Sequence, residues 1–196
     1  MSFEEQAYSV LVVSSSESFN TAMASMLPKT SFQPIVYAAS IAMAQRAVAE
    51  RDFDFIIINA PLKDDLGVRF AIDSSNKKAL VLILIQNEIL ADVNAKVSAF
   101  GVFTLAKPMS KPSMDNAIRW LLTTKKRLGK AEKNSAKMED KMQEIRLVNK
   151  AKWLLISKEG LLEPEAHRYL EKEAMNRCVS KKDIADEIIR KYEEIK

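Results

Sequence analysis

The stretch ALVLILI, residues 79–85, is the longest apolar run of the chain and decides its fold class. Its length fits a strand buried on both faces and falls far short of the roughly 18–20 residues that cross a membrane. Four further runs predict strands of the same kind, at residues 8–13, 34–39, 53–59 and 102–106. Strands that are buried on both faces belong to a parallel sheet covered by helices.

Helical patterns lie between these strands, at residues 17–27, 40–50, 66–73 and 88–100. The second of these patterns follows Ser40, a residue type that caps helix N-termini. The regular alternation of strand and helix predicts an α/β domain with helices on both faces of its sheet. In such domains ligands bind beyond the carboxyl ends of the strands.

The composition excludes several classes of protein. Of 196 residues, 47% are hydrophobic and 29% are charged, which is typical of a globular protein. The chain opens MSFEEQ, acidic where a secretory signal is basic, so we expect no export and a cytoplasmic location. The single cysteine, Cys178, excludes an internal disulfide, and with one histidine it excludes a His/Cys zinc site. We expect no cofactor, no metal and no membrane association.

The net charge of +4 is unevenly distributed. Residues 111–196 hold 21 Lys and Arg against 15 Asp and Glu, whereas residues 1–110 hold 9 against 11. A basic second half indicates a polyanionic partner. The alternative is that mixed charges only keep helix surfaces solvated.

The first half, residues 7–125, resembles the receiver domain of bacterial response regulators. A receiver carries an acidic pair after its first strand, a phosphate-accepting Asp after its third, then a Gly, a Thr or Ser after its fourth strand and Lys-Pro after its fifth. This chain keeps that frame, because Gly67 lies eight residues after Asn59 and Lys107 precedes Pro108 after the last strand. The resemblance implies a flavodoxin-like (βα)5 domain.

The residues at the chemical positions of a receiver are different. Ser14 and Ser15 replace the acidic pair, and Asn59 stands at the phosphoacceptor position. The Thr or Ser position falls at Gln86, or at Ile85 if the following segment is one residue shorter. An amide forms no acyl phosphate, and hydroxyls are poor ligands for Mg²⁺. We therefore expect a pseudo-receiver that serves in protein contacts, dimerisation or sensing of another signal.

Two neighbouring features complete this pocket. Asp64 and Asp65 are best explained as solvated turn residues, and metal binding is the less favoured alternative. Lys107 has lost its carboxylate partner, while Lys-Pro remains compatible with a cis bond that shapes the loop.

A weakly apolar heptad pattern follows Pro108 and Pro112. Residues recur at steps of four and three, as in the a/d seam of a coiled coil: Ala117, Leu121, Thr124, Leu128, Ala131, Ser135, Met138, Met142, Ile145 and Asn149. Gly129 weakens the helix by about 1 kcal/mol. We favour a parallel homodimer that carries two C-terminal heads; the alternative is a single helix folded back on the receiver.

Residues 146–189 contain short helices with clear boundaries. Gly160 predicts a helix end and Pro164 a first helical position, and Ser180 with Asp183 forms a capping box. The expected inward-facing residues are Ile145, Val148, Ala151, Leu155, Ala166, Leu170, Ala174, Ile184, Ala185, Ile188 and Tyr192. They predict a minimal three-helix unit, too small to be very stable alone.

Residues 138–192 resemble the ANTAR domain, the RNA-binding module of bacterial transcription antitermination regulators. The matching residues are Ala151, Lys152, Leu155, the acidic segment 163–165, Ala166, Leu170, Ala174, Met175 and Ala185. The order pseudo-receiver, coiled coil and ANTAR domain is also that of the amidase-operon antiterminators. We expect a pseudo-receiver over 1–110, a linker helix over 111–149 and the ANTAR module over 150–196, its first helix beginning at about 138.

The resemblance implies a function without enzymatic activity. The module binds paired hairpins with small loops in nascent mRNA, which prevents formation of the terminator hairpin. A dimer holds both hairpins. Relatives are controlled by receiver phosphorylation or by release from a ligand-sensing partner protein, and Asn59 favours the second kind of control.

The RNA-binding candidates are cations for phosphates and rings for stacking on bases. The cations are Lys150, Lys152, Arg168, Lys172, Arg177, Lys181 and Lys182, and the rings are Trp153, His167 and Tyr169. Trp153 and Tyr169 more often serve as core residues, and the other candidates also fit a solvated surface. Two functional alternatives stay open: a DNA-binding response regulator with a helix-turn-helix, and a protein that only binds other proteins.

Overall fold

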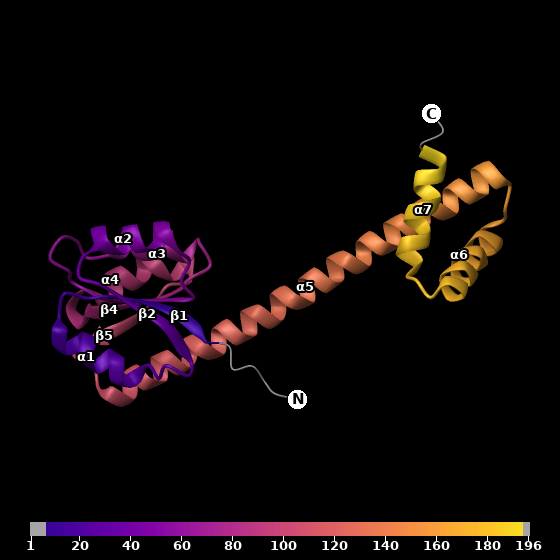
Figure 1. Cartoon of the computed structure of the whole chain (residues 1–196). Coiled ribbons are helices and arrows are strands. Elements are labelled where there is room, and N and C mark those ends of the chain that lie inside the picture. The colour runs from indigo at the N-terminus through magenta and orange to yellow at the C-terminus, as the bar shows by residue number, and fades with distance from the viewer. Residues whose placement is uncertain (1–6, 194–196) are drawn as a thin grey trace. The chain divides into compact units, whose positions relative to one another are not determined.

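The computed structural model describes residues 7–193. The chain divides into two compact units, Met1–Arg127 and Leu128–Lys196, which are called the N-terminal and the C-terminal unit below (Figure 1). The boundary between them falls within one helix, α5 (Lys111–Glu159). Among the described residues, no helix combines the length and the apolar character that a membrane crossing requires.

The N-terminal unit contains a five-stranded parallel sheet with the order β2-β1-β3-β4-β5. Its strands are β1 (Tyr8–Val13), β2 (Phe32–Ala38), β3 (Phe55–Asn59), β4 (Leu80–Gln86) and β5 (Phe103–Lys107). The apolar run ALVLILI supplies most of β4, which is buried from Leu80 to Ile85 between β3 and β5. The predicted parallel α/β sheet is confirmed.

Helices cover both faces of this sheet, as Figure 1 shows. One face carries α2 (Ile41–Glu50), α3 (Val68–Ser75) and α4 (Asn87–Val97), which continues into the 3-10 turn η1 (Ser98–Phe100). The other carries α1 (Glu17–Met26) and the first turns of α5.

Successive residues of each strand supply the two cores alternately. Leu11 and Val13 pack under α2, α3 and α4, whereas Val10 and Val12 pack under α1 and α5. This two-sided burial explains why the strands appear in the sequence as continuous apolar runs.

The heptad seam along α5 is shorter than predicted. Ala117 and Leu121 lie in the core under the sheet, so they do not serve as seam residues. Beyond Arg127, the large side chains of the seam are exposed, including Leu128, Met138 and Met142.

The C-terminal unit consists of the rest of α5, α6 (Glu163–Arg177) and α7 (Lys181–Glu193). Its core contains Ala151, Leu155, Ala166, Leu170, Ala174, Ile184, Ala185, Ile188 and Ile189, with Leu147, Val148, Leu154, Leu161 and Tyr192 packed against it. The prediction was wrong for Ile145, which is exposed. Leu147, rotated from it by about 200° around the helix, packs against the core instead.

The boundaries of these helices largely follow the predicted signals. Gly160 has a positive φ of 70° directly after α5, as expected of a helix end. Ser180 and Asp183 form the predicted capping box, in which Ser180 N–H donates to the Asp183 carboxylate and Asp183 N–H donates to Ser180 Oγ. Pro164 is the second residue of α6 rather than the first.

Candidate functional site

The carboxyl ends of β1, β3 and β5 bring together Ser14, Asn59 and Lys107. The Asn59 amide nitrogen donates to Ser14 Oγ over 3.1 Å, and Lys107 Nζ donates to Asn59 Oδ1 over 3.0 Å. Lys107 Nζ also donates to the carbonyl of Ala60, and Ser16 N–H donates to Ser14 Oγ over 3.1 Å. The neutral amide of Asn59 therefore occupies the position at which a receiver holds its phosphate-accepting carboxylate.

The remaining pocket residues lie outside this network. Ser15 and Gln86 are exposed, and Gln86 directly precedes α4. Burial lowers the pKa of Lys107, because desolvation disfavours the charged ammonium and the amide and carbonyl around it carry no compensating negative charge. The geometry holds a lysine in place without an acid that could accept a phosphoryl group.

The two neighbouring aspartates accept hydrogen bonds from backbone N–H groups. The Asp64 carboxylate accepts hydrogen bonds from Ile41 N–H at 3.2 Å and Ala42 N–H at 3.3 Å, at the start of α2. Asp65 accepts from Gly67 N–H over 2.5 Å, in the turn before α3. Within residues 7–193, no group of three or more His, Cys, Asp and Glu side chains is placed to hold a metal ion.

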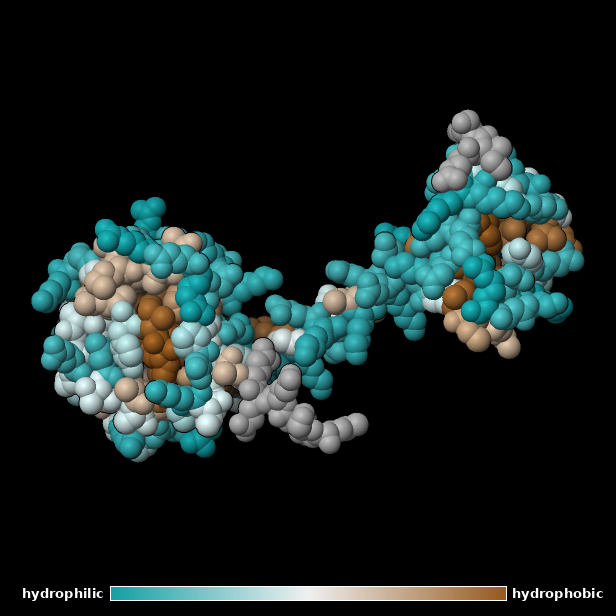
Figure 2. Space-filling view, in the orientation of Figure 1, coloured by the Kyte–Doolittle hydropathy of each residue, from teal (hydrophilic) through white to brown (hydrophobic). Residues whose placement is uncertain are grey.

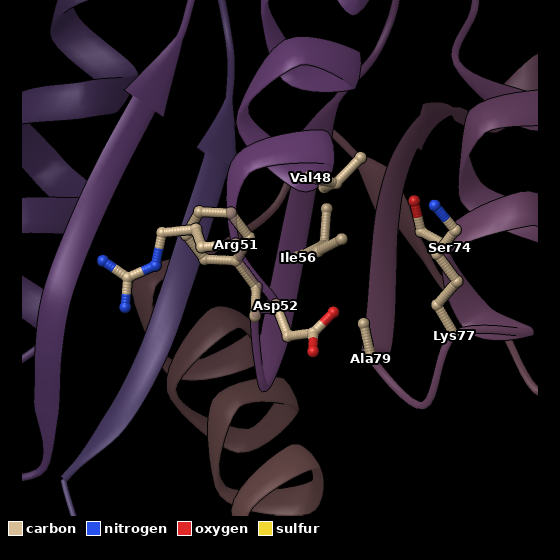
Figure 3. A pocket seen from close by; sticks show the side chains of 8 residues that line it. Val48, Arg51, Asp52, Ile56, Ser74, Lys77 and Ala79 are labelled. Carbon is tan, nitrogen blue, oxygen red and sulfur yellow. The ribbon is translucent and has the colours of Figure 1, made fainter.

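A hollow at the amino end of β3 is lined by Val48, Arg51, Asp52, Phe53, Ile56, Ser74, Lys77 and Ala79 (Figure 3). Its internal volume is about 10 Å³, room for about one water molecule. The Arg51 guanidinium carbon lies 5.4 Å from the centre of the Phe53 ring. The hollow is too small for a ligand.

In the C-terminal unit, four of the seven predicted RNA-binding cations are paired with carboxylates. The pairs are Lys150 with Glu193 at 2.5 Å, Lys152 with Glu163 at 3.0 Å, Arg177 with Glu187 at 2.6 Å and Lys181 with Glu171 at 2.6 Å. Exposed pairs of this kind each contribute about 0–1 kcal/mol. Their main structural effect is to join one helix of the unit to another.

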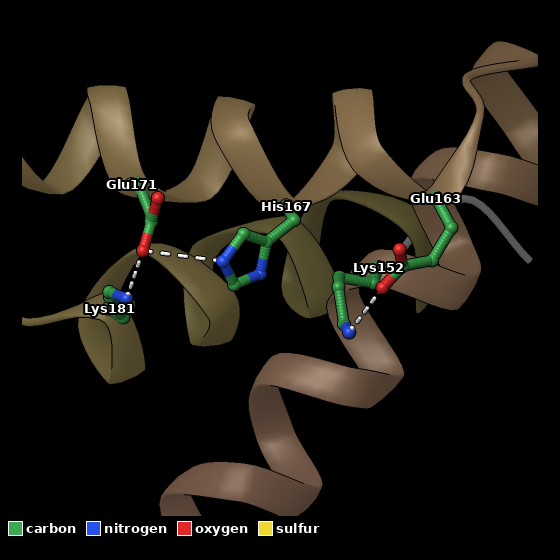
Figure 4. A network of polar contacts seen from close by, with 5 residues as sticks. All are labelled: Lys152, Glu163, His167, Glu171 and Lys181. Carbon is green, nitrogen blue, oxygen red and sulfur yellow. Dashed lines mark hydrogen bonds and ion pairs between the residues drawn. The ribbon is translucent and has the colours of Figure 1, made fainter.

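Several of these ion pairs lie along one flank of α6. Glu163, His167 and Glu171 follow one another at steps of four residues and therefore lie along one side of the helix. Figure 4 shows Lys152 reaching Glu163, and Lys181 and His167 both directed toward Glu171. The hydrogen bond from Lys181 lowers the pKa of Glu171, with further lowering by the charge of Lys181. This flank is thus bound to both neighbouring helices.

The outward side of α6, away from its core residues, carries Arg168 and Lys172, one helical turn apart. Both are exposed, and no carboxylate of residues 7–193 lies within ion-pair distance of either cation. Met175 extends this side by a further turn and is 78% exposed. Lys182, partly buried at the start of α7, likewise forms no ion pair with a described residue.

The aromatic candidates are not core residues. Trp153 is 74% exposed and Tyr169 is 45% exposed, so the core interpretation of both side chains is wrong. The small core is filled by aliphatic residues, with only Tyr192 packed against it among the aromatic residues of the described part of the unit. His167 is exposed and lies 3.3 Å from Glu171.

Sequence reasoning missed the acidic partners Glu163, Glu171, Glu187 and Glu193. The spacing of four residues signals the pair of His167 with Glu171. The other pairs join positions ten or more residues apart on different helices. Only the packing of the helices brings these side chains together, so no local sequence pattern indicates these ion pairs.

Both units are similar to known proteins. Residues 136–189 match the ANTAR domain family. The chain is similar to the transcriptional regulatory protein PdtaR of Mycobacterium tuberculosis, with 23% identity over 137 residues that cover 69% of this chain and 67% of that protein.

Solved structures share the fold of the N-terminal unit. The chemotaxis response regulator CheY4 of Vibrio cholerae matches with a TM-score of 0.51 and 21% identity, over 59% of this chain and 99% of that one. The signal receiver domain of an HD domain-containing protein from Pseudomonas fluorescens Pf-5 matches with a TM-score of 0.55 and 18% identity, over 66% and 96%. Residues 136–189 therefore match the ANTAR domain family, and the N-terminal unit ahead of them has the fold of a receiver domain.

Proposed function

We propose that this chain is an RNA-binding transcription antiterminator that binds paired hairpins in nascent mRNA and prevents termination. The observation that carries the proposal is the ANTAR match over residues 136–189, a segment that supplies nearly all of the three-helix core. ANTAR regulators are an RNA-binding antiterminator family. The similarity to a transcriptional regulatory protein supports the same class of function.

The outward side of α6 is the RNA-contacting surface that the charges favour. Arg168 and Lys172 make no ion pair with a described carboxylate, so phosphate contacts would cost them no existing partner. Binding to RNA releases condensed counterions, which provides much of the affinity. Tyr169 is half-exposed beside them and supplies a ring on which a loop base stacks.

The paired cations have a different role in this proposal. Lys152, Arg177 and Lys181 each connect two helices through a carboxylate, and Lys150 does so through Glu193. They position α6 and α7, and each charge is balanced by that of its carboxylate partner. Lys182 is the remaining unpaired cation near the N-terminus of α7, where backbone N–H groups also favour a phosphate.

Control of this activity is independent of phosphate on Asn59. Because Asn59 bonds to Ser14 and Lys107 through a neutral amide, no acyl phosphate forms there. We propose that homodimerisation through α5 or contact with a ligand-sensing partner protein regulates RNA binding instead. The N-terminal unit then acts as a surface for protein contacts in the cytoplasm, where nascent mRNA is made.

A single-round transcription assay tests this function. The template carries two short-loop hairpins, the second overlapping a terminator, and the full chain is added at increasing concentration. We expect the fraction of full-length transcript to rise with protein concentration. A matched template whose hairpin loops are replaced by unrelated sequence serves as control. Equal readthrough on both templates, or no rise on either, contradicts the proposal.

A further inference from the structure

A groove between α1 and the first turn of α5 takes no part in the hydrogen-bond network at the sheet edge. Both helices cover the same face of the sheet (Figure 1). The groove has an internal volume of about 240 Å³, whereas a cavity of about 150 Å³ is enough to hold benzene. This feature, called the α1–α5 groove below, therefore has room for a small organic molecule, unlike the hollow at the amino end of β3.

The inner lining of the α1–α5 groove is apolar and rich in methionine. Met23 and Met114 belong to the buried core, and Phe19, Met26 and Met109 are half-buried against it. Figure 2 shows that strongly hydrophobic residues take up only a small part of the visible face of the N-terminal unit. Four of the nine methionines of the chain line this one groove. Methionine side chains adapt to the shape of a ligand and make favourable contacts with aromatic rings, so the lining favours an aromatic ligand.

The rim of the groove supplies one positive charge. Ala22, Ser25, Ser110 and Lys111 line it and are exposed. Ser25 Oγ donates to the carbonyl of Ala22 over 2.7 Å, and Ser110 Oγ accepts from Ser113 N–H over 3.2 Å, so both hydroxyls are engaged within their own helical turns. Lys111 forms no ion pair with a residue of 7–193. Its ammonium group can therefore pair with an anionic ligand.

We propose that the α1–α5 groove binds a small aromatic carboxylate, with its ring against the methionines and its carboxylate beside Lys111. Burial of the ring removes apolar surface from water. A cationic aromatic molecule would meet the charge of Lys111 and no carboxylate among the described lining residues. The inference goes beyond the proposed function, because it does not depend on RNA binding. Since Lys111 and Met114 belong to α5, the ligand contacts the first turn of the helix that continues into the C-terminal unit.

Methyl NMR of the full chain tests this site, with carbon-13 in the methionine methyl groups and naphthalene-2-carboxylate as the probe. The titration extends to about 5 mM, beyond the roughly millimolar dissociation constant that a ligand of this size allows. We expect saturable shifts for the methionines of the groove, which are Met23, Met26, Met109 and Met114. The exposed methionines outside it should not shift, and these are Met43, Met138, Met142 and Met175. The absence of a saturable shift, or equal shifts in both groups, overturns the proposal.

A substitution on α1 tests whether the groove itself is the site. Ala22→Phe places a ring in the opening of the groove and should weaken probe binding by roughly tenfold or more, because the space is then overfilled. Ala24→Phe makes the same substitution at an exposed position of the same helix outside the lining and should leave binding unchanged. Full binding by the Ala22→Phe chain, or the same loss in both variants, overturns the assignment of the site.

The charge of the ligand is tested at Lys111. Lys111→Gln should weaken binding of naphthalene-2-carboxylate by about two- to fivefold, since an exposed charge pair contributes modestly. Binding of the neutral naphthalene-2-carboxamide should not change. Lys126→Gln removes the same charge at an exposed position of α5 outside the groove and serves as the control. Equal affinity of the unaltered chain for the acid and the amide, or equal losses in the two variants, overturns the anionic class of ligand.

Discussion

The two units of this protein hold their polar side chains in opposite ways. At the carboxyl edge of the sheet, Lys107 is half-buried and bound to Asn59 and Ala60. On the outward side of α6, Arg168 and Lys172 are exposed and form no ion pair with residues 7–193. At the sheet edge the ammonium group is engaged by neighbouring amide and carbonyl groups, whereas on α6 both cations are exposed. This difference favours the helices over the sheet edge as the proposed site of polyanion recognition.

The cores of the two units differ as well. The sheet lies between two extensive layers of large aliphatic and aromatic side chains. The helical unit depends on a single small cluster in which Ala151, Ala166, Ala174 and Ala185 allow close approach of the helices. A small core leaves a small margin of stability, so the C-terminal unit is the more sensitive to substitution.

The largest expected effect of a single substitution is on the small core. Leu170→Ala removes a nearly fully buried side chain and lowers the free energy of unfolding by about 2–5 kcal/mol. Urea denaturation followed by circular dichroism should show the loss of the C-terminal helices before the sheet unfolds. Met175→Ala, on the same helix but largely exposed, is the control. Equal effects of the two substitutions contradict the assigned core.

Charge reversal on the outward side of α6 should have the next largest effect. Arg168→Glu with Lys172→Glu replaces two phosphate contacts by repulsion and should weaken hairpin binding by roughly tenfold to a hundredfold. Lys130→Glu with Lys133→Glu makes the same change in net charge on exposed residues outside the ANTAR match. Equal losses of affinity for the two double variants would mean that net charge alone determines binding.

A smaller effect is expected at Asp54, which joins β1 to α5. Burial raises the pKa of Asp54, but hydrogen bonds from Lys125 and Ser9 outweigh this effect and lower it overall. A lowered folded pKa stabilises the N-terminal unit at pH values above the unfolded pKa of about 3.9. This stabilisation is lost as the pH falls through the folded pKa.

Asp54→Asn should therefore make the stability of the N-terminal unit less dependent on pH in the acid range. Thermal unfolding at pH 7 and at pH values below 4 measures the difference. The two proteins should differ most at neutral pH and approach each other at low pH. A constant difference at every pH contradicts the assigned ionic contact.

The last prediction is that a phosphate donor does not modify the chain. Acetyl phosphate with Mg²⁺ should leave the chain unmodified, because an amide occupies the acceptor position and no described cluster of acidic residues is placed to hold a metal. Intact-mass spectrometry measures the outcome. A gain of one phosphoryl group at or near Asn59 would show that the sheet edge retains receiver chemistry.

The sequence predicted the layers of the fold, because strands buried on both faces leave continuous apolar runs such as ALVLILI. It also predicted the neutral pocket, since the frame from Asn59 to Gly67 and Lys107 identifies the positions. It failed for Ile145 and Trp153. Helix α5 has two apolar faces, and periodicity alone does not say which face meets the core.

The candidate RNA-binding surface was predicted only as a list of residue types. Lys152 and Lys172 look alike in the sequence, yet the first pairs with Glu163 across two helices and the second makes no ion pair with a described residue. That distinction depends on the packing of α5, α6 and α7. It could be drawn only once the helices were assembled.

The most direct test of the central claim compares nucleic acids. Filter binding of the full chain to an RNA that carries two short-loop hairpins, and to duplex DNA of the same length at the same salt concentration, measures the preference. Recognition by the ANTAR domain predicts tighter binding to the RNA, with the preference reduced by Arg168→Glu and Lys172→Glu. Tighter binding to duplex DNA, or binding to neither, would contradict it.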